Sequence, residues 1–191
     1  PPNLPVVEAC HNCNHGFSLG EEYVSTIVEC TLSGSASPSA QRRPKVAKTL
    51  LRNTKLRERI QLARVESSGE TSFIVEVSRV HNILVKLAKG HAAHELGVGG
   101  LGEPDSVGFQ PIPCLEEKQW WGFEAPPVPD VFPEVGTRAF QRQYINSGGR
   151  PEWVIVQDGR YRFLAFEGDE GYVVRMVLSE YLAGEVIWKD I

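Results

Sequence analysis

The sequence predicts an α+β fold, with helices in the first half of the chain and strands in its last third. Apolar residues recur at helical spacing over residues 18–32, 44–65 and 79–96. After residue 150 the pattern changes to short apolar runs separated by turn residues, which is typical of strands. A hydrophobic content of 41% in 191 residues is enough to bury a core.

Composition divides the chain into four regions. They are a cysteine-containing start (1–32), a helical region (33–98), an irregular connection rich in glycine and proline (99–133) and a β-rich domain (134–191). The pattern Ser18-x-x-Glu21 is a capping box and predicts that the first helix starts at about Ser18. The small residues 33–40 predict a flexible linker before a second helix that begins at Pro44.

The β-rich region carries one strong turn signal. Asp158 and Gly159 lie between the apolar runs 153–157 and 161–166, which predicts a hairpin. Residues 171–178 and 184–188 predict further strands.

No stretch approaches the roughly 18 apolar residues that a membrane helix needs, and the start lacks the pattern of a secretion signal. The four cysteines do not form the spacing of a disulfide framework, so we expect a soluble cytoplasmic protein that has no membrane partner. The chain starts at Pro1 rather than at methionine, as a processed or partial chain would.

The charge is unevenly distributed. The whole chain carries −4, but residues 41–64 contain nine basic residues and one acidic residue, a local charge of about +8. A basic helix can simply be a solvated face, yet its single sign within an acidic chain favours contact with phosphates. The residues that we expect to bind DNA are Arg42, Arg43, Lys45, Lys48, Arg52, Lys55 and Arg59.

Cys10 and Cys13 have the spacing of a zinc knuckle, in which two thiolates three residues apart share one ion. Such a knuckle supplies two of four ligands. The others would come from Cys30, Cys114, a histidine or residues outside this chain, although Cys30 fits the apolar face of the first helix better and Cys114 fits a structural role.

The segment from Asn3 to Asn14 resembles the second half of a zinc-stapled HNH endonuclease motif, in which Asn-Leu precedes C-x-x-C and a His or Asn follows it. The resemblance implies a partial ββα-metal, treble-clef-like knuckle. Asn3 would then be the middle residue that orients a catalytic loop, and Asn14 would help to bind a catalytic Mg²⁺ or Mn²⁺. Cys10 and Cys13 would hold half of a structural zinc site. The histidine that activates water in this family should precede Asn3, where this chain has only Pro1 and Pro2.

Two function hypotheses follow. The first is a metal-dependent HNH-type DNA endonuclease that hydrolyses phosphodiester bonds, and the second is a non-catalytic zinc-knuckle module that binds nucleic acid. A homodimer is compatible with either hypothesis. His91, His94 and Glu95 do not have the H-E-x-x-H spacing of a metalloprotease helix, so a metal site there is the weaker interpretation. His15 is a candidate for a substitute contact to metal or phosphate.

Overall fold

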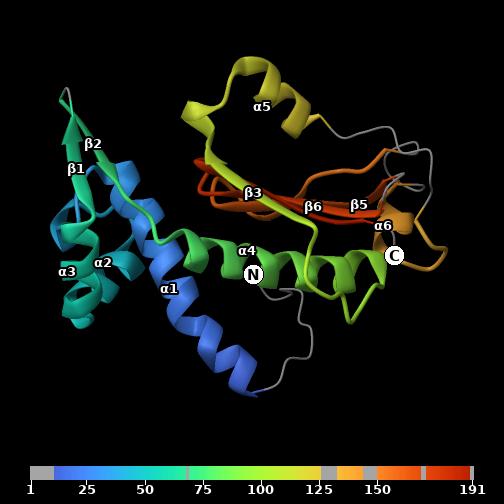
Figure 1. Ribbon diagram of the computed structural model, residues 1–191, viewed down its shortest axis with the longest axis horizontal. Coiled ribbons are helices and arrows are strands. Elements are labelled where there is room, and N and C mark those ends of the chain that lie inside the picture. Colours follow the sequence, from blue (N-terminus) through green and yellow to red (C-terminus); the bar gives the residue numbers. More distant parts are fainter. Residues whose placement is uncertain (1–10, 68, 126–132, 144–149, 169–170, 190–191) are drawn as a thin grey trace. The chain divides into compact units, whose positions relative to one another are not determined.

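The computed structural model describes residues 11–67, 69–125, 133–143, 150–168 and 171–189. The chain divides into two compact units, Ala9–Ile83 and Leu84–Ile191. We call them the helical unit and the sheet unit. Helices and antiparallel sheets confirm the α+β class (Figure 1). The division falls inside a helix, upstream of the boundary that composition suggested.

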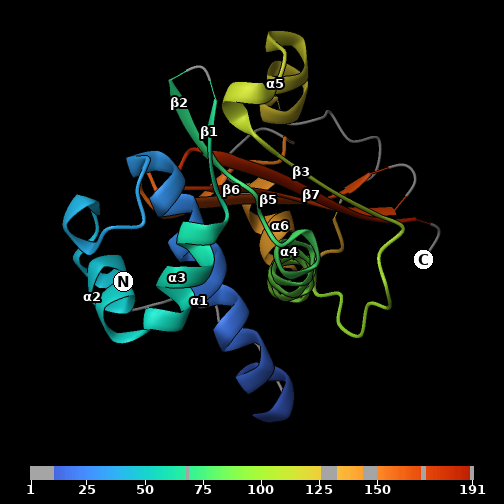
Figure 2. The ribbon, with the colours of Figure 1, turned by 60° about the vertical axis from the view of Figure 1, so that its left-hand side comes forward.

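The helical unit is built on one long helix. Its elements are α1 (His11–Ser33), a short 3₁₀ turn (Pro38–Ala40), α2 (Pro44–Arg52), α3 (Thr54–Leu62), β1 (Arg64–Ser67), β2 (Glu70–Phe73) and the start of α4 (Val77–His91). Figure 2 shows α2 and α3 beside α1, and both contact it. The buried side chains of α1 include Tyr23, Val24 and Ile27, which follow the predicted helical spacing.

The first helix begins earlier than its capping pattern predicted. It starts at His11, so Ser18 lies inside the helix on an exposed position. The segment that follows His11 contains no proline, and the helix therefore runs through the capping pattern without interruption. As a result Cys13 and Asn14 belong to the first turn of α1.

The basic segment forms two helices, whereas the sequence predicted a single one from Pro44 to Val65. The break is at Asn53, whose Oδ1 accepts a hydrogen bond from the backbone N–H of Leu56 at 3.0 Å. Asparagine is a preferred N-cap residue, so this bond starts α3 where α2 ends.

The predicted flexible linker, residues 33–40, is held in place by hydrogen bonds. The Gln41 side chain donates from Nε2 to the carbonyl oxygens of Ser35 at 2.7 Å and Ser37 at 2.9 Å. Ala36 is only 1% exposed. The linker thus fixes how α2 follows α1.

The sheet unit contains a five-stranded antiparallel sheet with the order β3-β7-β6-β5-β4. Its strands are β3 (Ser106–Pro111), β4 (Val154–Gln157), β5 (Tyr161–Gly168), β6 (Gly171–Leu178) and β7 (Leu182–Lys189). The predicted hairpin is confirmed, because β4 pairs with β5 around Asp158 and Gly159, and Gly159 has the positive φ of +64° that the turn requires.

The expected irregular connection, residues 99–133, contains regular structure. It holds β3, a 3₁₀ turn at Ile112–Cys114 and α5 (Glu117–Glu124). The sequence did not predict β3, because Gly108 and Pro111 are both depleted in strands. Pairing with β7 forms this strand instead.

Helices cover both faces of this sheet (Figure 1). The second half of α4 and α6 (Arg138–Gln141) lie on one face, and α5 lies on the other. Leu84 of α4 lies so close to β7 that a Cβ on Gly184 would be 2.9 Å from its Cδ2. On the same face the ring of His91 stacks on Phe163 with 3.6 Å between centroids. Among the described residues, no helix has the length and the apolar composition needed to cross a membrane.

Candidate nucleic-acid interface

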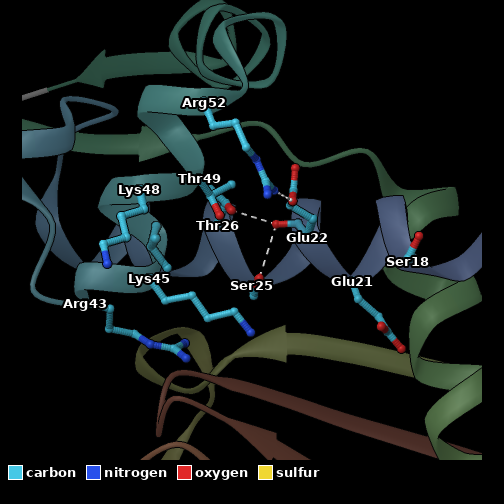
Figure 3. Close-up of a pocket in the computed structure, with 11 residues that line it drawn as sticks. Ser18, Glu21, Glu22, Ser25, Thr26, Arg43, Lys45, Lys48, Thr49 and Arg52 are labelled. Atoms are coloured by element: carbon cyan, nitrogen blue, oxygen red, sulfur yellow. Dashed lines mark hydrogen bonds and ion pairs between the residues drawn. The ribbon is translucent and has the colours of Figure 1, made fainter.

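A groove of about 900 Å³ lies between α1 and α2 in the helical unit (Figure 3). Its α1 wall consists of Ser18, Glu21, Glu22, Ser25 and Thr26. Its α2 wall consists of Arg43, Lys45, Val46, Lys48, Thr49 and Arg52. Four of the seven residues that we expected to bind DNA therefore line one groove.

Helical periodicity explains why one set of α2 residues forms a wall of the groove. On α2 the residues 45, 48, 49 and 52 recur every three or four positions and face the groove, while Leu50 is buried on the other side of the helix. Val46 is the only apolar residue of the lining, and it is 3% exposed. The other lining residues are polar or charged, and four cations against two carboxylates favour an anionic ligand.

Glu22 connects the two walls. Its Oε2 lies 2.7 Å from Nη2 of Arg52, and its Oε1 accepts a hydrogen bond from Nδ2 of Asn53 at 2.9 Å. Asn53 in turn caps α3. One carboxylate of α1 thus fixes both the last residue of α2 and the residue that starts α3.

Two further predicted DNA-binding residues are paired with carboxylates. Arg43 lies 3.5 Å from Glu29, which is 5% exposed, so this pair is largely shielded from water. Arg59 lies 3.6 Å from Glu76. Together with Arg52, these arginines have partners within the helical unit and contribute less charge to a ligand than the sequence suggested.

The remaining predicted residues, Arg42, Lys45, Lys48 and Lys55, are exposed. Within the described parts of the chain none of them has an ion pair or a side-chain hydrogen bond. Figure 3 shows Lys45 and Arg43 on one side of α1, with Arg52 on the other side beside Glu22. Of the four unpaired cations, Arg42 precedes α2, Lys45 and Lys48 lie on α2, and Lys55 lies in the first turn of α3.

The HNH-like residues are only partly within the described structure. Asn3 and Cys10 lie outside the described residues. Cys13 and Asn14 are described by their backbone alone, in the first turn of α1, and so is His15. None of these side chains can be assigned a contact.

The other metal candidates do not form a site. Among the described residues no three His, Cys, Asp or Glu side chains lie close enough to hold a metal ion. Nε2 of His91 is hydrogen-bonded to the hydroxyl of Tyr161, and burial lowers the pKa of His91 to about 3. Glu95 is held by Arg142 through two hydrogen bonds of 3.0 and 3.1 Å. These residues stabilise the sheet unit.

Cys30 and Cys114, the cysteines whose side chains are described, differ in exposure. Cys30 is fully buried, as the sequence predicted, and burial raises the pKa of its thiol to about 12. This environment favours a neutral thiol over the thiolate that zinc needs. Cys114 is exposed, and its carbonyl oxygen accepts a hydrogen bond from Nε2 of Gln110 at 2.7 Å, so the structural role that we expected for it stays a prediction.

Sequence reasoning did not identify Glu22 or Asn53. Asn53 carried a local signal, because asparagine before threonine can cap a helix. Glu22 carried none, since its partners are 30 and 31 residues away in the chain.

Comparison with protein-family models, with curated proteins and with solved structures found no match. The functional assignment therefore depends on the groove and on the HNH-like motif.

Proposed function

We propose that this chain binds DNA through α2 and α3 and belongs to a metal-dependent, HNH-type DNA endonuclease. The observation that supports binding is the row of exposed, unpaired cations Arg42, Lys45, Lys48 and Lys55. Exposed lysines without carboxylate partners contribute little to folding and are available to phosphates. Such contacts position DNA without reading its sequence.

The support for cleavage is the motif around Cys10, Cys13 and Asn14. In HNH enzymes the last His or Asn of the motif is on a helix, and Asn14 lies in the first turn of α1. In this proposal Asn3 orients the catalytic loop and Asn14 helps to bind Mg²⁺ or Mn²⁺. The ion would stabilise the charge that develops on the phosphate.

A structural zinc would be held by Cys10 and Cys13 with two further ligands. Cys30 does not fit this role, because its thiol is buried and its pKa is raised. Cys114 belongs to the sheet unit. The candidates that remain for the missing ligands are Cys114, a histidine or residues outside this chain.

The alternative is a zinc-knuckle module that binds nucleic acid without cutting it. This alternative needs no general base, so it predicts binding of nucleic acid without nicking that depends on a divalent metal ion.

Binding and nicking assays test the proposal. We expect a labelled duplex to bind with an affinity that falls steeply as salt rises. We also expect plasmid nicking with Mg²⁺ or Mn²⁺ from a form that carries the missing histidine, and loss of nicking in Asn14→Ala. Salt-insensitive or absent binding would overturn the DNA proposal. Unchanged nicking in Asn14→Ala would remove the role assigned to that residue.

Elemental analysis tests the zinc site separately. About one zinc per chain after dialysis would support a knuckle at Cys10 and Cys13, and Cys13→Ser should then lose it. A metal-free chain would contradict a zinc site completed within these 191 residues.

A further inference from the structure

The groove between α1 and α2 encloses a volume next to two of the exposed cations, Lys45 and Lys48. Its volume of about 900 Å³ is in the range of pockets that enclose a ligand of a few hundred daltons. We infer that this groove holds the sugar–phosphate backbone of a single nucleic-acid strand, and that Lys45 and Lys48 contact its phosphates. The inference rests on the proposed DNA binding and deepens it by naming the form of the substrate.

The dimensions favour one strand over a duplex. Because α1 and α2 contact each other, their axes are expected to be roughly 8–10 Å apart. A groove along two contacting helices can take one phosphate backbone, whereas the two backbones that flank a major groove about 12 Å across cannot both lie in it. The α1 wall runs from Ser18 to Thr26, about 12 Å of helix, so only a few nucleotides can lie along it.

The charges of the two walls orient the strand. The α2 wall carries Lys45 and Lys48 without partners, whereas the α1 wall carries Glu21 and Glu22. Phosphates are therefore attracted to α2 and repelled from α1. The lining residues include no aromatic side chain on which a base could stack, so we expect the contacts to be made to phosphates and the affinity to depend little on base sequence.

The groove also leads to the HNH-like motif. Ser18, at one end of the α1 wall, is one helical turn after Asn14 on the same helix. A strand that leaves the groove at this end passes the first turn of α1. The groove would thus guide the strand toward the turn of α1 that contains Asn14.

The experiment compares two double substitutions with the same change in charge. Lys45→Glu/Lys48→Glu changes the groove, and the control Lys118→Glu/Arg150→Glu changes two exposed cations of the sheet unit that neither line the groove nor belong to the proposed DNA-binding set. The probes are a fluorescein-labelled 12-mer of deoxythymidine and a duplex of the same length, measured by anisotropy from about 50 to 200 mM salt. Circular dichroism checks folding, and Lys45→Gln/Lys48→Gln provides a milder groove variant.

We expect the single strand to bind at least as tightly as the duplex. The groove variant should weaken its binding by about tenfold or more and reduce the salt slope by about 1.4, while the control changes affinity by less than about threefold. Equal losses in both variants, or a strong preference for duplex, would overturn the groove assignment and leave DNA binding intact. Failure of the unmodified chain to bind either probe would overturn the proposed function itself.

Discussion

Basic residues of the two units illustrate two different roles, exposed lysines without partners in the described structure and a shielded arginine with two carboxylate partners. In the helical unit Lys45 and Lys48 are exposed and have no carboxylate partner among the described residues. In the sheet unit Arg162 is only 13% exposed at its side chain, and its guanidinium contacts Glu124 at 2.8 Å and Glu180 at 3.0 Å. The same guanidinium lies 4.5 Å from the ring centre of Trp153.

Arg175 of the sheet unit also has a carboxylate partner, as Arg162 does. It lies 2.7 Å from Glu185, and its Nη1 donates to the carbonyl oxygen of Phe123 at 2.8 Å, near the end of α5. Positive charge at the C-terminal end of a helix is stabilising. These two arginines attach α5 to the sheet. The comparison teaches that charge alone does not identify a binding residue, because a cation with satisfied partners already has a structural role.

The largest effect on stability should come from the protonation of His91 at low pH. Burial lowers the pKa of His91 in the folded state from 6.5 to about 3. Because the folded-state pKa is depressed, neutral His91 stabilises the fold fully above pH 6.5, and this stabilisation is lost as pH falls toward 3. We expect the free energy of unfolding to fall by about 1.4 kcal/mol per pH unit across that window.

Urea denaturation at several pH values measures this slope. His91→Phe keeps an aromatic ring against Phe163 and removes the titrating group, so its curve should be flatter between pH 6 and 4. An equally steep curve in that variant would show that another group is responsible.

The next largest loss of stability should come from substituting Arg162. Replacing it with methionine keeps the aliphatic contact to Trp153 but leaves Glu124 and Glu180 without their cation, which we expect to cost about 2–3 kcal/mol. Chemical denaturation followed by tryptophan fluorescence measures the loss. A change below about 0.5 kcal/mol, the size expected at an ordinary surface position, would contradict the structural role of this arginine.

A smaller effect is expected at Asn53. Asn53→Ala removes the cap of α3 and the bond to Glu22, and should destabilise the helical unit by about 1 kcal/mol. Hydrogen exchange of the α3 amides should rise, while exchange in β5 and β6 stays constant. Asn53→Asp serves as the control, since it retains a capping oxygen and loses the amide donor to Glu22. An α3 exchange rate unaffected in Asn53→Ala would show that the cap is not needed.

The smallest effect on stability should come from Lys48→Ala. This substitution tests directly whether an exposed lysine without a partner serves DNA binding rather than folding. We expect stability to change by no more than about 0.5 kcal/mol, because the side chain has no partner among the described residues. DNA binding should weaken, with the salt slope reduced by about 0.7 to 0.9. A loss of stability like that of Arg162→Met would mean that Lys48 is a structural residue.

Local patterns in the sequence predicted much of this fold. The Asp158-Gly159 turn and its flanking apolar runs identified β4 and β5, because a tight turn and its strands are specified by adjacent residues. The strand β3 was not predicted, since its residues are poor strand formers and it depends on pairing with β7. The first helix was predicted too short because a capping pattern does not stop a helix that already continues through it.

The candidate site also combines features that the local sequence predicts with features that depend on tertiary packing. The sequence by itself determined that positive charge is concentrated between residues 41 and 64 and that much of it lies on helices, because composition and periodicity are local properties. Only the tertiary structure decided which of these cations have partners. Arg43, Arg52 and Arg59 are paired with carboxylates that belong to other elements or to the segments between them, and packing brings those carboxylates into contact. Lys45 and Lys48 acquire their proposed role because the same packing sets them, without carboxylate partners, along the groove beside α1.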